Sequence, residues 1–294
     1  MGNNSSEEAP LVSVLMTAYN CEKYIAEAIE SVLASTFANF ELIIVDDCSS
    51  DSTMAIAKSY ELKDRRIKVF KNKINLGDYP NRNEAASFAK GKYLKYVDAD
   101  DRINIDGLQY CVDSMEKYAA AGMGMLSFEK PSENDSIYLM ESRDVIQNHF
   151  YTKQCLTIGP SGTIINNDKF KKIGGFDCRF GVASDMYFNL KMASLFPVLF
   201  LPKVFFYYRL HDGQQQNNPY GYFINGYLYQ KIILEEKILP LSDLAIMRLK
   251  KKNIKRLTIN FTKLLLSGES TGPYWKILNE LQIRKFEMIK SLFY

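Results

Sequence analysis

The stretch VSVLMTAYN, residues 12–20, decides the fold. Its first part, Val12–Met16, is apolar and rich in β-branched side chains, which predicts a buried strand. Small and polar residues, Thr17–Asn20, then end the strand. Apolar residues follow at the spacing of one helix face, namely Ile25, Ala28, Ile29 and Val32. The chain therefore begins with the order strand, loop, helix.

This order repeats over the first hundred residues. Glu41–Val45 predicts a second strand, and the cap-forming residues Ser49–Asp51 predict a helix after it. A third strand is expected at Ile67–Phe70, a third helix at Arg82–Lys90 and a fourth strand at Tyr93–Val97. Strands that alternate with helices indicate an α/β fold, in which a mainly parallel sheet is flanked by helices.

Acidic residues end two of these strands. Asp46 and Asp47 end the second, and the motif YVDADD ends the fourth with Asp98, Asp100 and Asp101. The carboxyl ends of parallel strands form one crevice, where ligands bind. Clustered carboxylates repel each other unless a cation or hydrogen-bond donors compensate, and Mg²⁺ or Mn²⁺ binds such groups together with phosphates. The pattern favours a nucleotide or metal site; the alternative is that Asp98 and Asp101 cap a turn and the following helix.

Four motifs occur in series, VSVLMTAYN, IIVDDCSSDST, NLGDYPNRNEAASFAKGKYL and YVDADD. In this order and spacing the chain resembles the family 2 glycosyltransferases. Weaker matches extend the resemblance to about residue 212, namely GGFD at 174–177, Asp185 and YRLH at 208–211. The resemblance implies a GT-A fold and inverting transfer of a sugar from a nucleotide diphosphate to an acceptor hydroxyl.

The chain is expected to consist of three parts. The first is a flexible N-terminus at 1–10, the second a catalytic domain at 11–218, and the third, from its helical pattern, a C-terminal region at 219–294. Within the catalytic domain, residues 11–110 would bind the nucleotide and residues 111–218 the acceptor.

The donor nucleotide is placed by the resemblance on the first two strand ends. Asp47 would accept the imide N–H of uracil, which implies a uridine donor, and Asp46 would orient the loop. Arg82 matches an arginine near the base or phosphates; the alternative is a helix-surface arginine paired with Glu84 or solvent. The first-loop residues that would hold the base are Thr17, Ala18, Tyr19 and Asn20.

The reacting end of the donor is assigned in the same way. Asp185 would be the general base that takes the acceptor's proton, although it also fits a helix cap. Ser184 stands where the family usually has Glu, which removes a neighbouring carboxylate that would tune Asp185. His211 matches a late histidine that reaches the metal or diphosphate, against a surface or packing role. The sugar-facing and metal-binding residues would be Asp98, Ala99, Asp100 and His211, with Asp100 the principal ligand of Mn²⁺ or Mg²⁺.

The expected product is a glycan with one more sugar. The Q-x-x-R-W element of processive members does not occur, and the only tryptophan is Trp275, so one sugar per acceptor visit is expected. Hexoses and N-acetylhexosamines both remain open. A glycan or lipid-linked acceptor in surface polysaccharide assembly is suggested only by the family.

Composition excludes other classes. Of the 294 residues, 47% are hydrophobic, enough for a full core. Basic residues number 37 against 34 acidic, and a net charge of +3 gives no footprint for nucleic acid. Five scattered cysteines without C-x-x-C spacing suggest a reduced, cytoplasmic protein. The apolar runs are shorter than the ~20 residues of a membrane-spanning helix.

The second half is less regular. Loops are expected between Ser127 and Phe180, then a short helix at Ser184–Ala193 and paired strands near Val198–Leu201 and Val204–Arg209. After Pro219 the pattern is helical, with apolar stripes at Leu257, Phe261, Leu264 and Leu265 and at Phe286, Ile289 and Phe293.

Three roles for the C-terminal helices stay open. They are packing onto the catalytic domain, homodimer formation, and peripheral contact with the inner face of a membrane. The basic run behind the third role is Lys250, Lys251, Lys252, Lys255 and Arg256.

Two other functions were weighed. GMGMLS at 122–127 approaches the glycine fingerprint of a dinucleotide oxidoreductase, but it does not follow the first strand. Ser184 and the long C-terminal region also fit a sugar-nucleotide binding or scaffold protein that has lost turnover.

Overall fold

The structure is a computed structural model that describes residues 9–127, 136–211 and 219–266, together with Trp275, Leu278, Ile283, Met288 and Lys290. Most of the expected flexible N-terminus lies outside the described residues, as do Phe286, Ile289 and Phe293 of the second C-terminal stripe.

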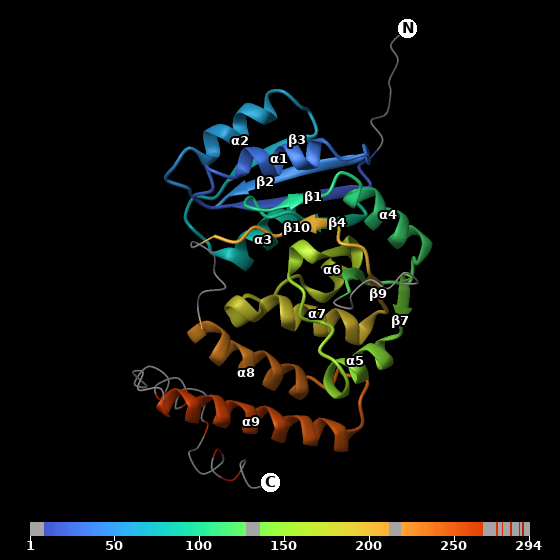
Figure 1. The fold of residues 1–294 in the computed structure, drawn as a ribbon, viewed down its shortest axis with the longest axis vertical. Coiled ribbons are helices and arrows are strands. Elements are labelled where there is room, and N and C mark those ends of the chain that lie inside the picture. Colours follow the sequence, from blue (N-terminus) through green and yellow to red (C-terminus); the bar gives the residue numbers. More distant parts are fainter. Residues whose placement is uncertain are drawn as a thin grey trace.

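Eight strands form one mixed sheet in the order β3-β2-β1-β4-β8-β6-β9-β7 (Figure 1). The first four are parallel: β3 (Ile67–Lys71), β2 (Phe40–Asp46), β1 (Val12–Ala18) and β4 (Tyr93–Tyr96). Three helices alternate with them: α1 (Ile25–Leu33), α2 (Thr53–Glu61) and α3 (Asp78–Ser87). These elements confirm the expected series, although α3 begins at Asp78 rather than Arg82.

The side-chain alternation of β1 separates two cores. Val12, Val14 and Met16 pack into a cluster with α1 and α2, whereas Leu15 packs into a cluster with α3. Successive side chains of a strand point to opposite faces, so a strand covered on both sides is mainly apolar. This is why apolar residues in the run Val12–Met16 are nearly continuous and do not alternate with polar ones. Ser13, the one polar residue of this run, is buried and donates to Glu41 at 2.6 Å.

Four further strands complete the sheet: β8 (Thr163–Asn166), β6 (Met123–Leu126), β9 (Val198–Leu201) and β7 (Tyr138–Met140). The pairs β4–β8, β8–β6 and β9–β7 are antiparallel, and β6–β9 is parallel. Their helices are α4 (Gly107–Lys117), α5 (Ser142–Tyr151), α6 (Asn167–Ile173) and α7 (Ser184–Leu195), with 3₁₀ turns η1 (Pro160–Gly162) and η2 (Cys178–Ala183).

The expectation of loops in this half is wrong, because α5, β8 and α6 lie between Ser127 and Phe180. These elements are short, and their apolar positions acquire a face only through tertiary packing. The segment 122–127, which the sequence already excludes as a glycine fingerprint, contains β6.

The strands near Val198–Leu201 and Val204–Arg209 do not pair with each other. β9 lies between β6 and β7, while β10 (Phe206–Tyr207) pairs antiparallel with β5 (Arg102–Ile103). Asn104 fixes the approach of β10, because its backbone N–H bonds the carbonyl of Phe205 at 3.0 Å. The residues after β10 are thereby carried back to the acidic cluster that follows β4.

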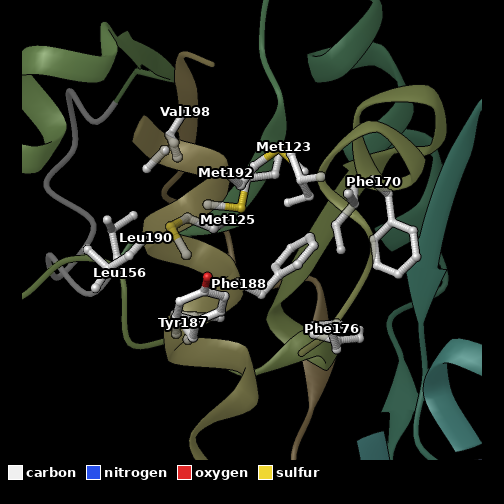
Figure 2. Packing of buried hydrophobic residues seen from close by; sticks show 14 of the residues in the cluster. Met123, Met125, Leu156, Phe170, Phe176, Tyr187, Phe188, Leu190, Met192 and Val198 are labelled. Atoms are coloured by element: carbon white, nitrogen blue, oxygen red, sulfur yellow. The ribbon is translucent and has the colours of Figure 1, made fainter. Parts of the chain in front are cut away.

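Aromatic rings fill the core beneath α7 (Figure 2). Phe188 is 1% exposed, and its ring centroid lies 4.6 Å from that of Phe176 and 5.4 Å from that of Phe170. Met123, Met125 and Met192 fill the space between α7 and the sheet. This packing holds α7, and therefore Asp185 at its start, against the sheet.

We expect Phe188→Ala to lower the free energy of unfolding by about 3–5 kcal/mol, because it leaves a cavity among rings that cannot collapse into it. Chemical denaturation measures this change. Leu62→Ala is the control, since Leu62 is 89% exposed and should change stability little. A loss below about 1 kcal/mol for Phe188→Ala would contradict the packing described.

The C-terminal helices α8 (Pro219–Glu235) and α9 (Asp243–Leu266) stack below α7, at the end of the molecule away from β1–β3 (Figure 1). The Tyr187 hydroxyl donates to Glu236 at 2.6 Å, and Asn253 Nδ2 donates to the Tyr227 carbonyl at 3.0 Å. Packing onto the catalytic domain is therefore present, and dimer formation stays a prediction. Among the described helices, none combines the length and hydropathy that crossing a membrane requires.

The expected stripe on α9 is largely buried. Leu257 and Phe261 are 2% and 3% exposed and Leu264 packs beside them, whereas Leu265 is 48% exposed. The boundaries predicted at residues 10, 110 and 218 remain predictions.

Candidate active site

The carboxyl ends of β2, β1 and β4 meet at one edge of the sheet, as their order predicts. Ala18 pairs with Asp46 in the sheet register, and the N–H of Asp47 donates to the carbonyl of Ala18 at 2.8 Å. On the other side of β1, the N–H of Val97 donates to Leu15 at 3.0 Å. The first loop, the Asp46–Asp47 pair and the acidic cluster after β4 therefore surround one edge.

The loop after β1 is fixed by hydrogen bonds to the loop after β2. Asn20 has a left-handed backbone, with φ of 51°, and its side chain accepts from the N–H of Ser50 at 2.9 Å. Thr17 is half-buried and Ala18 is buried. Tyr19 is 52% exposed, so one face of its ring is available for stacking. Thr17 and Ala18, which were expected in the loop, are the last residues of β1, and Tyr19 and Asn20 follow it, so all four lie at the edge of the sheet where the crevice forms.

Asp46 and Asp47 are both buried, with different environments. Asp46 Oδ2 accepts from the N–H of Ser49 at 3.1 Å, and its Oδ1 has no hydrogen-bond partner among the described residues. Asp47 Oδ1 accepts from Leu76 N–H and Asn72 Nδ2, and Oδ2 accepts from Gly77 N–H, all at 2.8 Å. Asp47 therefore fixes the loop before α3, and one of its roughly four acceptor positions remains.

Arg82 is not a surface residue. It is 7% exposed; its Nε donates to Asp78 at 2.7 Å and its Nη1 to Asp98 Oδ1 at 2.6 Å. Ser161 donates to Asp98 Oδ2 at 2.9 Å. Burial alone would raise the pKa of Asp98, but the Arg82 charge and both hydrogen bonds outweigh it and hold that pKa below its ordinary value. Asp98 is therefore an oriented carboxylate.

Asp98, Asp100 and Asp101 can each present one carboxylate oxygen within 4.8 Å of the others. Asp100 Oδ2 lies 2.8 Å from His211 Nε2, and the His211 ring stacks on Tyr24 at 5.0 Å. Asp101 Oδ1 accepts from Arg209 N–H at 2.9 Å, whereas its buried Oδ2 has no partner among the described residues. Burial, then the Asp98 charge, raises the pKa of Asp101 to about 7.

This cluster fits a hard divalent cation. Three carboxylates converge, and an orphaned buried oxygen points to a missing positive partner. Carboxylate oxygens are ligands that suit Mg²⁺ and Mn²⁺ better than they suit softer metals. Asp101 is expected from the sequence only to end the strand or to cap a turn and the following helix, and not to be a ligand; its place directly after Asp100 is the available signal.

Asp185 lies in the first turn of α7, close enough to Arg82 and Tyr79 for both to affect its pKa. Its Oδ1 accepts from the N–H of Met186 at 2.7 Å. Burial is the main cause that raises its pKa to about 7; the charge of Asp78 acts the same way, while Arg82 and a hydrogen bond from Tyr79 oppose it. Such a carboxyl exchanges protons near neutral pH.

Ser184, which stands where the family usually has Glu, has hydrogen-bond partners of its own. It is fully buried, and its hydroxyl donates to the carbonyls of Asp177 at 2.9 Å and Gly181 at 2.8 Å. Ser184 therefore fixes the turn that leads into α7. Burial is the main cause of the raised pKa of Asp185, so a carboxylate at position 184 is not needed to raise it.

Sequence reasoning missed four residues that hold this site: Asp78, Tyr79, Ser161 and Lys95. Lys95 Nζ donates to the carbonyls of Tyr96 at 2.6 Å and Ser161 at 2.5 Å, and burial lowers its pKa to about 8. It thereby fixes the turn that presents Ser161 to Asp98. A lysine inside a buried strand was the only signal in the sequence. Ala99, chosen for donor binding, is 1% exposed and packs into the core cluster beside α1.

Residues 13–174, more than half of the chain, match the family model described as Glycosyl transferase family 2. The chain belongs to glycosyltransferase family 2. The enzyme is 42% identical over 125 residues to the glycosyltransferase EpsE of Bacillus subtilis, covering 41% of this chain and 45% of that protein. It is 39% identical over 112 residues to the teichuronic acid biosynthesis glycosyltransferase TuaG of the same organism, covering 38% and 44%. The chain spans less than half the length of these curated relatives.

Solved structures support the fold of this glycosyltransferase. S. aureus TarS in complex with UDP is 21% identical, with a TM-score of 0.70 over 96% of this chain and 80% of that one. The mannosyltransferase PcManGT of Pyrobaculum calidifontis, in complex with GDP-Man and Mn²⁺, is 14% identical, with a TM-score of 0.63 over 97% and 84%. The GT-A fold expected from the motifs is confirmed.

Proposed function

We propose that this glycosyltransferase moves a hexose or N-acetylhexosamine from a UDP-linked donor to an acceptor hydroxyl in surface polysaccharide or glycan assembly. The observation that carries the proposal is the crevice itself. Asp98 is oriented by Arg82 and Ser161, its carboxylate converges with those of Asp100 and Asp101, and Asp185 lies within electrostatic reach of the same Arg82. Relatives named for teichuronic acid and for a diphosphoundecaprenol acceptor support the acceptor class.

The donor base stacks on Tyr19, and uracil donates its imide N–H to the acceptor position left on Asp47. Cytosine lacks that N–H, so uridine is preferred. The curated WfgD of Escherichia coli, 43% identical over 91 residues, is named for a UDP-Glc donor, which supports this choice.

The chain's own groups then carry out transfer. Arg82 and Asp98 fix the donor, and Asp185 removes the proton of the acceptor hydroxyl as that oxygen attacks the anomeric carbon from the face opposite the diphosphate. Attack from that face inverts the configuration. Asp98, Asp100 and Asp101, with His211 beside Asp100, would hold a divalent ion, which supplies charge neutralisation on the departing diphosphate.

Nucleotide binding tests the donor assignment. In the presence of Mn²⁺, we expect UDP to raise the melting temperature more than CDP or GDP does, because a ligand of the native state stabilises it in proportion to affinity. Tyr19→Ala should weaken UDP binding about tenfold through lost stacking. Tyr151→Ala is the control, since Tyr151 is 55% exposed on α5. A larger shift with GDP or CDP would contradict the assignment.

Turnover separates this proposal from a binding or scaffold protein. Ser184, which suggested lost turnover, has a structural role here. Release of UDP from UDP-glucose or UDP-N-acetylglucosamine, dependent on Mn²⁺, supports the enzyme; tight binding without release in any acceptor mixture would support the scaffold. Cytoplasmic location, membrane contact and dimer formation remain part of the proposal.

A further inference from the structure

Three hollows lie in a row between the catalytic domain and the C-terminal helices. The first, about 620 Å³, lies between α5 and α9; the second, about 180 Å³, shares Tyr151 and Thr152 with it. The third, about 240 Å³, shares Gln154 and Arg256 with the second. Because each hollow shares lining residues with the next, the three lie side by side, and we call them together the interhelical row.

The row begins beside the proposed catalytic base. Ala183 and Met186, which flank Ser184 and Asp185, line its third hollow together with Thr157. A side-chain carbon added at Gly159 would lie 3.7 Å from Asp185 Oδ2, so the backbone after Thr157 passes close to the base. A chain lying in the row would therefore have one end near Asp185 and would run away from the donor crevice along α9.

The walls of the row are positively charged. Four cationic side chains line it, against one acidic side chain, Asp144; the cations are Arg143, Arg248, Lys252 and Arg256. Among the described residues, none of these four has a carboxylate within ion-pair distance. Arg256 is partly buried, and its Nη2 donates to the Gly226 carbonyl at 3.0 Å. A partly buried cation without a carboxylate favours an anionic ligand.

The remaining walls combine apolar side chains, among them Met140, Leu241 and Leu244, with polar and aromatic ones. Tyr151, Tyr227 and Tyr229 supply rings, and Gln154 and Asn148 supply amides. Rings with polar tips and amides suit a hydroxyl-rich chain better than an apolar one. An acyl chain would leave these amides and cations without partners, which is costly.

We propose that the interhelical row binds the acceptor and selects a linear glycan that carries negative charges, either carboxylates or phosphates, along its length. This inference rests on the proposed function, because it takes Asp185 as the base at which the acceptor's hydroxyl is presented. The cations contact the anionic groups of the acceptor, and the C-terminal helices are thereby part of the substrate site.

Calorimetric binding without donor tests the row directly. The probes are an unsulfated chondroitin hexasaccharide, which carries carboxylates, a short poly(glycerol phosphate), and neutral chitohexaose. We expect at least one anionic probe to bind about tenfold more tightly than chitohexaose, and its binding to weaken with added salt. The anion that binds more tightly identifies the charged group as carboxylate or phosphate.

Matched variants locate the binding surface. Arg248→Gln and Arg256→Gln should each weaken the anionic probe about tenfold, the value of one charge-assisted hydrogen bond. Arg256→Gln also removes the hydrogen bond to the Gly226 carbonyl, which belongs to the fold. Arg248 is exposed, so Arg248→Gln is the variant that should leave the fold unchanged. Lys68→Gln is the control, because Lys68 is an exposed lysine on β3 and lines none of these hollows.

Equal binding of the charged and neutral probes, or equal weakening by Lys68→Gln, would overturn the inference. Failure of the proposed function is seen separately, as absence of UDP binding with Mn²⁺, since the probe measurements contain neither donor nor metal. Unchanged UDP binding in Arg248→Gln shows that the variant affects the acceptor alone.

Discussion

Asp100→Ala is expected to lower kcat about 10³-fold while the protein remains folded, because the variant removes the carboxylate that we propose as the principal metal ligand. Asp100 and Asp101 both contact the segment after β10, and Asp100 is the one whose partner there is the side chain of His211. Asp98, by comparison, already accepts from Arg82 and Ser161. Steady-state release of UDP at saturating Mn²⁺ measures the loss.

The control for this variant is Asp113→Ala, which removes an exposed carboxylate whose bond to Gln109 lies on α4, away from the crevice. It should leave kcat unchanged. If Asp100→Ala retained activity within tenfold of the parent, or if a chelator did not affect the parent enzyme, the metal-dependent mechanism would be wrong.

Asp185→Asn is expected to lower kcat for acceptor transfer 10²- to 10⁴-fold, roughly the contribution of a general base, and to leave UDP affinity unchanged. The amide keeps the volume and still accepts from Met186 N–H, so the start of α7 should remain intact. Asp168→Asn, an exposed carboxylate on α6, is the control. Loss of UDP binding in Asp185→Asn would show a structural role instead.

The pH dependence follows from the same residue. Burial raises the pKa of Asp185 to about 7, so the protonated, inactive form predominates below that pH and the carboxylate above it. We therefore expect kcat/KM to rise with pH through about 7 and then to level off. In Asp185→Asn this rising limb should disappear. A limb that persisted would assign the pH dependence to another group, first of all Asp101, whose pKa burial also raises to about 7.

The fold of the first half could be predicted because its signals are local. Val12–Met16 and Glu41–Val45 are short apolar runs ended by polar loops, and each becomes a strand within a residue or two of the expected ends. The parallel order of these strands then brings Tyr19, Asp47 and Asp98 to one edge. Position at a strand end was therefore enough to collect most of the candidate site.

The partners of these residues could not be predicted, because they come from distant segments. Ser161 lies 63 residues after Asp98, and Arg209 lies 108 residues after Asp101. The first of these contacts depends on the turn that Lys95 holds, and the second on β10 pairing with β5 rather than β9. Such contacts are set by tertiary packing and leave no periodic signal.

Ser184 stands where the family usually has Glu, and the effect of this difference on Asp185 could not be predicted from the sequence. The loss of a carboxylate suggested weaker tuning of Asp185, but burial is the larger influence on that pKa. Ser184 itself is fully buried and bonds two carbonyls, a role in which its small hydroxyl fits. Burial depends on how α7 packs against the sheet, which only the structure describes.

Anomalous diffraction at the manganese edge, from crystals soaked with Mn²⁺ and UDP, tests the central claim most directly. The account predicts a single strong peak within coordination distance of a carboxylate oxygen of Asp100, with the diphosphate on its other side. A well-ordered UDP in the crevice with no manganese peak at Asp100, or with that carboxylate turned away from the ion, would contradict it.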